Sequence, residues 1–117
     1  MGSNDDPKAS SARAPGDRLQ ALLAMLEREP GDAFCLYGIA QEHARAGRHP
    51  MALEWFDRAI AADPDGAYAY FHKARSLEEL DRVPETVATL RQGLEAARRS
   101  RDSHAASELA GYLDQLT

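Results

Sequence analysis

The sequence predicts an all-α protein in which about six helices stack as antiparallel pairs, the arrangement called an α-solenoid. Between residues 33 and 62, apolar side chains recur three, four and seven positions apart in two successive stretches, as on one face of a helix. Gly47 lies in a turn between these stretches, and Asp63-Pro64 ends the second. The same pattern then recurs over residues 67–100. Because neither helix of a pair can bury its apolar stripe alone, we expect the pairs to stack on one another.

Residues 33–66 carry the most regular pattern. The expected core faces of the two helices are formed by Leu36, Ile39, Ala40 and His43 and by Ala52, Phe56, Ala59 and Ile60. With Gly47 and Pro64, this spacing resembles the tetratricopeptide repeat signature, W-x2-L-G-x2-Y, then A-x3-F, then P, over a repeat length of about 34 residues. The match is weaker in the first half, where Leu36 replaces Trp and His43 replaces Tyr. The resemblance implies a right-handed superhelical stack whose first helices line a concave surface.

A second, more degenerate repeat is predicted over residues 67–100. Pro84 takes the same place in this repeat as Pro50 takes in the first, and the apolar positions around the two prolines match. Arg98 stands where the closing proline is usual, so the last helix of this pair is expected to run on past it. Gly93 lies inside that helix and costs roughly 1 kcal/mol relative to alanine. We expect it to let the last helix of the chain approach closely.

The N-terminal segment divides into two parts. Residues 1–16 are rich in Ser, Ala, Asp, Pro and Gly and have no apolar period, which predicts a disordered tail. Residues 17–30 have an apolar helical face, and Asp17 is expected to be the N-cap of this helix. Pro30 precedes Pro64 by one repeat length, so this helix stands where the second helix of a preceding repeat would stand. It is therefore expected to be a half-repeat.

Residues 102–116 are expected to form a capping helix that begins at Asp102 or Ser103. Its narrow apolar stripe consists of Ala106, Leu109, Leu113 and Leu116. A polar outer face is what the end helix of a solenoid requires. The resemblance thus covers a single domain over residues 17–117, similar to small stand-alone bacterial tetratricopeptide proteins of about this length.

Composition narrows the class of protein further. The 117 residues are 44% hydrophobic, with no run of about 18 apolar residues that would predict a membrane span. No secretory signal is visible, and the single cysteine fits a reducing compartment, so a cytoplasmic location is expected. The net charge of −5 argues against nucleic-acid binding through a basic surface. A monomer or a weak homodimer is expected.

No residue constellation predicts catalysis, a metal site or a cofactor. Phosphate-loop, zinc-protease and nucleophile-elbow motifs do not occur in the sequence. His43 lies on the apolar face of its helix, where a packed, hydrogen-bonded core histidine is favoured over a metal ligand. Cys35 is interpreted as a small core residue rather than a nucleophile. We therefore predict that the protein is not an enzyme.

The resemblance implies that the outward faces of the first helices form a peptide-binding groove. Its expected residues are Phe34, Tyr37, Gln41 and Arg45 in the first repeat and Tyr68, Phe71, His72, Arg75 and Glu79 in the second. Large rings beside hydrogen-bonding side chains are typical of peptide-binding surfaces. The alternative is that Phe34 and Tyr68 only pack against neighbouring helices. One groove type of the family grips a terminal carboxylate with Lys and Asn, and Tyr37 and Gln41 occupy two of those places here, so that specific activity is not predicted.

The predicted function is a protein–protein interaction module, a scaffold or adaptor that binds a peptide or helix segment. The alternative is a regulatory or RNA-associated subunit that uses an arginine-rich end formed by Arg91, Arg98, Arg99 and Arg101. Trp55 is expected on the convex side, where it is covered by Arg58 or a neighbouring helix, or forms a dimer contact.

Overall fold

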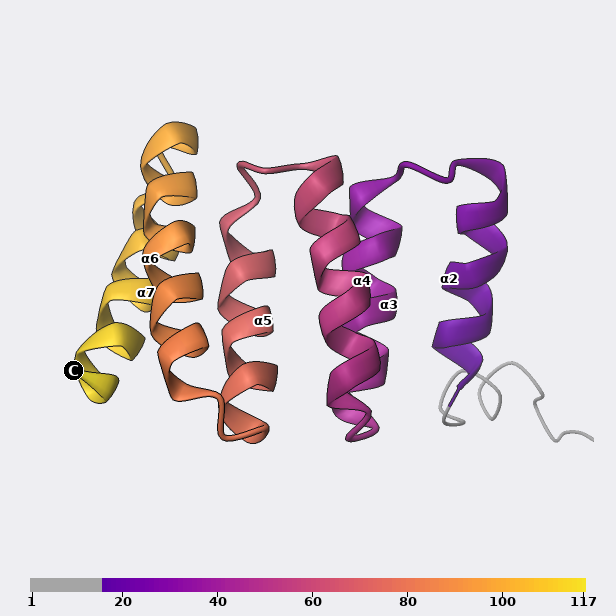
Figure 1. Ribbon diagram of the computed structural model, residues 1–117. Coiled ribbons are helices and arrows are strands. Elements are labelled where there is room, and N and C mark those ends of the chain that lie inside the picture. Colours follow the sequence, from indigo (N-terminus) through magenta and orange to yellow (C-terminus); the bar gives the residue numbers. More distant parts are fainter. Residues whose placement is uncertain (1–15) are drawn as a thin grey trace, which may run out of the picture.

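The computed structural model describes residues 16–117, and this part of the chain consists of six helices joined by short turns, without a strand. The helices are α2 (Asp17–Arg28), α3 (Ala33–Arg45), α4 (His49–Ala62), α5 (Ala67–Glu79), α6 (Val83–Ser100) and α7 (Ser103–Leu116). Figure 1 shows them side by side, each antiparallel to the next. The predicted all-α solenoid is confirmed. The tail predicted over residues 1–16 lies outside the described residues, except for Gly16.

Each helix packs mainly against its neighbours in the sequence. The strongest packing is between α3 and α4 and between α5 and α6, while α4 joins α5 and α6 joins α7. The molecule measures 56 × 28 × 24 Å, so it is about twice as long as it is wide. None of the six described helices is long and apolar enough to cross a lipid bilayer.

The turns within the two pairs have the same backbone conformation. Gly47 and Asp81, which occupy equivalent positions in the two repeats, have φ values of 79° and 57°. This left-handed conformation folds the following residue back, so that the Arg48 amide donates to the carbonyl oxygen of His43 at 2.9 Å. Arg101 repeats this conformation at the end of α6, which runs past Arg98 to Ser100 as expected.

Two aspartates begin helices as N-caps, and one prediction of this kind is wrong. The Asp102 carboxylate accepts from the Ala105 amide at 2.9 Å, and that of Asp32 accepts from the Phe34 amide at 2.9 Å. Asp17 is not an N-cap, because α2 begins one residue earlier than expected and Gly16 takes that position. Asp17 instead lies in the first turn, where its negative charge interacts favourably with the helix dipole.

The core consists of three clusters of buried side chains along the solenoid. Its largest completely buried side chains are those of Phe56, Ile39, Leu90 and Leu109. In α7 the stripe differs slightly from expectation, because Ala105 is completely buried and Ala106 only partly. Gly93 has the predicted role: a Cβ atom there would lie 2.8 Å from the Cβ of Tyr70 and 2.9 Å from the Cδ2 of Leu109.

His43 is a core histidine, as the sequence indicated. Its side chain is buried, and the Nε of Arg48 donates to its Nδ1 at 2.9 Å. Its ring stacks on that of Trp55, with centroids 6.3 Å apart, and the Arg58 guanidinium covers the Trp55 ring at 4.3 Å. Cys35 is completely buried, and burial, followed by the nearby Asp32 carboxylate, raises the pKa of its thiol. A raised pKa disfavours the thiolate and hence nucleophilic chemistry.

Candidate functional site

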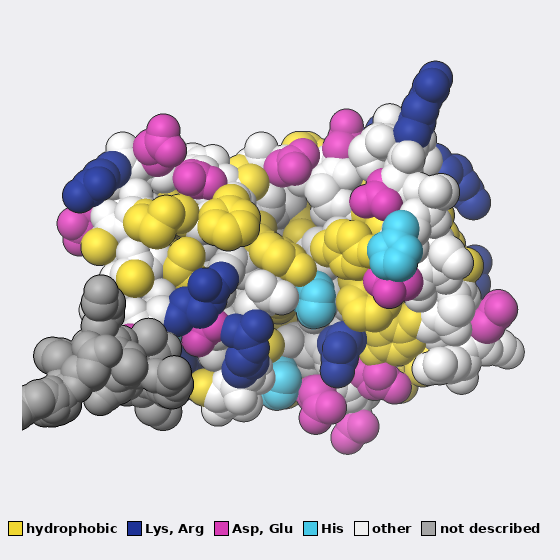
Figure 2. Space-filling view, turned by 180° about the vertical axis from the view of Figure 1, so that it is seen from behind, with side chains coloured by type: hydrophobic (Ala, Val, Ile, Leu, Met, Phe, Trp, Pro, Cys, Tyr) yellow, Lys and Arg dark blue, Asp and Glu magenta, His cyan; other side chains and the backbone are white. Residues whose placement is uncertain are grey.

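Helices α3, α5 and α7, together with the turns before them, present a hollowed face. Figure 2 shows this face, on which hydrophobic side chains lie beside histidine, arginine and acidic side chains. Three cavities occur here among the described residues, and each takes most of its lining from these three helices and their turns. The sequence-predicted groove residues are divided among the three.

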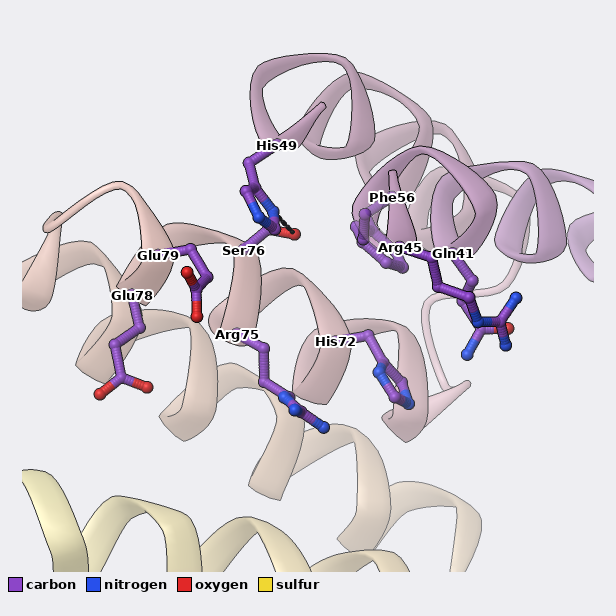
Figure 3. A pocket seen from close by; sticks show the side chains of 10 residues that line it. Gln41, Arg45, His49, Phe56, His72, Arg75, Ser76, Glu78 and Glu79 are labelled. Carbon is purple, nitrogen blue, oxygen red and sulfur yellow. Dashed lines mark hydrogen bonds between the residues drawn. The ribbon is translucent and has the colours of Figure 1, made fainter. Parts of the chain in front are cut away.

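The first cavity, of about 590 Å³, lies towards the ends of α3 and α5. Five of the predicted groove residues line it: Gln41, Arg45, His72, Arg75 and Glu79. Phe56, His49 and Ser76, which were not among the predicted groove residues, line it too. His49 Nδ1 and Ser76 Oγ are 3.0 Å apart, which joins the start of α4 to α5 (Figure 3).

The second cavity, of about 690 Å³, lies where α3, α5 and α7 begin. It is lined by the predicted residues Phe34, Tyr37 and Tyr68 and by His104 of α7. Phe34 is 64% exposed, so it does not pack into a neighbouring helix. Tyr68 is partly buried against the rings of Phe71 and His104, at centroid distances of 6.3 and 6.4 Å.

The third cavity, of about 460 Å³, lies between α5 and α7 and contains Phe71. The Phe71 ring packs edge-on against Tyr112, with centroids 5.5 Å apart. Tyr112 in turn donates its hydroxyl to Glu78, and burial together with this bond raises the tyrosine pKa. Tyr112 was not among the predicted groove residues, because the predicted role of its helix was that of a cap alone. The available signal was that α7 takes the place of the first helix of a further pair and carries an aromatic residue.

Tyr37 and Phe71 are equivalent in sequence but do not touch the same cavity. His72 stands between them, with its ring 5.7 Å from that of Tyr37 and 5.3 Å from that of Phe71. Gln41 Nε2 donates to the Tyr37 hydroxyl at 3.3 Å, so these two side chains separate the first cavity from the second. The face therefore consists of separate cavities with aromatic side chains between them, rather than one continuous groove.

The charges along this face are unevenly satisfied. Arg45 pairs with Glu42, which also pairs with Arg18 at 3.2 Å. Arg75 lines both the first and the third cavity, and within residues 16–117 it forms no ion pair. Burial lowers the pKa of His72, and the Arg75 and Arg45 charges lower it further.

The arginine-rich end is partly neutralised within the chain. Arg98 pairs with Glu95 at 2.5 Å. Arg99 pairs with Asp65 at 2.7 Å and donates to the carbonyl oxygen of Pro64 at 3.0 Å, which ties α6 to the turn before α5. These arginines therefore have structural partners that the sequence did not reveal. Across the described helices and turns, no three histidine, cysteine or acidic side chains are grouped to hold a metal ion.

Comparisons with known proteins agree with this architecture. The family model described as tetratricopeptide repeat matches residues 8–67 and again residues 37–101. A tetratricopeptide repeat domain protein from Salinibacter ruber is 33% identical, with a TM-score of 0.70 over 75% of this chain and 89% of that one. The TPR2B domain of yeast Sti1, solved as a complex with pHsp70, is 21% identical, with a TM-score of 0.81 over 93% of this chain and 84% of that one.

One curated relative is much longer than this chain. The DnaJ protein P58IPK homolog of Arabidopsis thaliana is 33% identical over 92 residues, which is 79% of this chain. The chain spans only 19% of the length of that protein. Since the family model covers most of the sequence, and the described helices stack as paired repeats with matching turns, the chain belongs to the tetratricopeptide repeat family.

Proposed function

We propose that the chain is a protein-interaction module, a scaffold or adaptor that holds a peptide or helical segment of a partner on the face of α3, α5 and α7. The observation that carries this proposal is the row of cavities on one face, lined by rings and by side chains that can form further hydrogen bonds. The yeast Sti1 domain, which has the same fold, was solved as a complex with pHsp70, and this supports a partner-binding role.

The contact is proposed to run across Tyr37, Gln41, Phe71 and Arg75. The two rings offer apolar area at a low cost in conformational entropy, and the guanidinium of Arg75 offers a fork of donors without an ion pair in the described part of the chain. Because two repeats and one further helix present only a short surface, the interface is expected to be small. We expect a dissociation constant in the micromolar range, on the order of 1 to 100 μM.

The test is a selection of binders from a library of random peptides displayed on phage, with the full chain as the target. Selected peptides are then measured by fluorescence anisotropy against Tyr37→Ala/Phe71→Ala and against Arg75→Gln, whose side chain is exposed. Both variants are expected to weaken binding at least about fivefold, since each removes a central contact. Thermal melting shows whether the double variant, which loses partly buried rings, is still folded.

The matched control is Arg91→Glu/Arg98→Glu, which reverses two charges at the arginine-rich end and spares the Arg99–Asp65 pair. This variant is expected to bind the selected peptides as the parent does. Should it lose binding while the groove variants keep it, the groove proposal is wrong. A steep dependence of binding on salt concentration would then favour the electrostatic alternative.

A further inference from the structure

His72 of α5 is held in place by three aromatic rings from three helices. Its ring stacks on Phe56 at 6.5 Å with an interplanar angle of 13°, and it meets Tyr37 and Phe71 edge-on at 5.7 and 5.3 Å. The side chain is only partly exposed, and it lines the first cavity. The imidazole is thus oriented in advance, with its remaining surface turned to the groove (Figure 3).

Two arginines line the same cavity as His72. Figure 3 shows Arg75 on one side of the imidazole and Arg45, beside Gln41, on the other. Arg75 has no ion-pair partner in the described chain, and Arg45 shares one carboxylate, that of Glu42, with Arg18. Two arginines and one carboxylate, that of Glu108, act on His72, so the surroundings of the imidazole are positive on balance, although Glu78 and Glu79 also line the cavity.

We propose that the groove recognises an acidic side chain of the partner between Arg45 and Arg75, over the edge of His72. Binding of this side chain is coupled to protonation of His72. This inference rests on the proposed function. A carboxylate there gains two guanidinium donors, and the imidazolium adds a third cation. The partner of this site is therefore an acidic peptide, whose charge complements that of the two arginines.

The other groups around His72 confine the carboxylate to this place. Glu78 and Glu79 line the far side of the cavity, beyond Arg75, and would repel an acidic side chain there (Figure 3). Glu108 of α7 is the one carboxylate that opposes the arginines at His72. Lys73, the next residue of α5, is already paired with Asp57 at 2.7 Å, and His49 of α4 bonds to Ser76.

The sign of the proton coupling follows from these surroundings. In the free protein, burial and then the charges of Arg75 and Arg45 lower the pKa of His72 from 6.5, so the ring is neutral at neutral pH. A bound carboxylate reverses the local field and raises that pKa. Binding therefore takes up a proton between the free and bound pKa values, and affinity rises as the pH falls through this window. Acidic side chains of the peptide titrate near 4 and stay charged in this range.

The experiment uses the full chain and the phage-displayed random peptides described above, selected at about pH 6. Peptides that need Tyr37 and Phe71 are synthesised with each acidic residue intact or replaced by its amide. Acidic residues are expected to be enriched, and one amide replacement per peptide should abolish the pH dependence. Affinity should rise as the pH falls from about 8 to 5.5, by up to about tenfold for each unit by which the His72 pKa rises on binding.

Variants assign the proton to one residue. His72→Gln should remove the pH dependence, whereas His104→Gln, an exposed histidine of the second cavity, should keep it. Because His72→Gln loses packing, a second measurement follows the His72 ring by NMR in the parent and in Arg75→Gln. The pKa of His72 should rise on peptide binding, and it should also rise in the free Arg75→Gln protein.

The outcomes separate the two proposals. Peptides that bind through Tyr37 and Phe71 without acidic enrichment, or with an affinity independent of pH, overturn the inference and leave the proposed function standing. An unchanged His72 pKa on peptide binding also overturns the inference. If no peptide depends on Tyr37 and Phe71, the proposed function fails, and the inference fails with it.

Discussion

At the scale of the residue, Gly93 determines how closely three helices approach. It lies on α6 at the point where Tyr70 of α5 and Leu109 of α7 meet that helix. The Cβ atom of Tyr70 is attached directly to the backbone, so it cannot move away from an added side chain unless α5 moves. The helical cost of glycine, roughly 1 kcal/mol against alanine, is therefore offset by packing.

We predict that Gly93→Ala destabilises the protein by up to about 2 kcal/mol. Overpacking costs about 1 to 3 kcal/mol and outweighs the gain of roughly 1 kcal/mol in helix propensity. The matched control is Gly111→Ala in α7, where an added Cβ would have no atom within 4 Å. That variant is expected to be more stable than the parent by up to about 1 kcal/mol. Urea unfolding of both proteins gives the free energies, and equal gains in both would contradict the role of Gly93.

For His43, the sequence predicted the packing of the side chain but not its partners. Its place on an apolar face was enough to predict a packed histidine. Its hydrogen-bond partner, Arg48, was not predicted, because it follows the left-handed turn at Gly47 that reverses the chain direction. The contact with Trp55 likewise depends on the packing angle between α3 and α4. Side-chain partners across a turn follow from backbone geometry, which a residue pattern does not contain.

At the scale of the element, α7 is the helix that closes the C-terminal side of the core. Ala105 and Leu109 are almost completely buried, and Tyr112, Leu113 and Leu116 pack against the same cluster. Removing residues 103–117 would expose the α6 side of this cluster. By area, the loss of about three such side chains is worth several kcal/mol, comparable to the whole stability of a small domain.

We predict that Leu109→Ala lowers the free energy of unfolding by about 2 to 5 kcal/mol, as is usual for a buried leucine. Leu116→Ala, in the last turn of the same helix and only partly buried, is expected to cost less than about 1.5 kcal/mol. Chemical unfolding of the two variants under one set of conditions measures both values. A Leu109→Ala protein that unfolds at the same urea concentration as Leu116→Ala would show that α7 is not a structural cap.

At the scale of the whole molecule, the protein is an elongated stack held together by contacts between neighbouring helices. Each helix packs mainly on those adjacent in sequence, and α2 packs only on α3 to a substantial extent. In such a solenoid the stability is roughly a sum over repeats and the interfaces between them. An end helix with one interface is therefore held less firmly than an interior helix with two or more.

We predict that amide hydrogen exchange under native conditions is fastest in α2 among the six helices and slowest in α4, α5 and α6. Local opening requires less free energy where fewer buried contacts are broken. Exchange measured by mass spectrometry on peptides from α2 (Asp17–Arg28) and α5 (Ala67–Glu79) compares the two cases directly. Equal protection of both helices would mean that the chain opens as one cooperative unit, contrary to this expectation.

The sequence by itself determined the class of fold, the number of helices and most of their ends. These features depend on local interactions: apolar periodicity, the turns at Gly47 and Asp81, the prolines at the starts of α4 and α6, and the Asp102 cap. The N-cap predicted at Asp17 was the exception. The preceding residue, Gly16, is also a residue type found at N-caps, so the sequence does not determine which of the two begins α2.

Only the tertiary structure decided how the groove residues are grouped. Helix α6 has 18 residues where α4 has 14, so α7 begins out of step with the period of the two repeats. That offset places Tyr112 against Phe71 and Glu78 and His104 at the second cavity, while the contact between Gln41 and Tyr37 separates the first cavity from the second. Distances between side chains on different helices depend on the rotation and shift of each helix against the next. Those quantities result from packing over the whole stack, and no local pattern of residues specifies them.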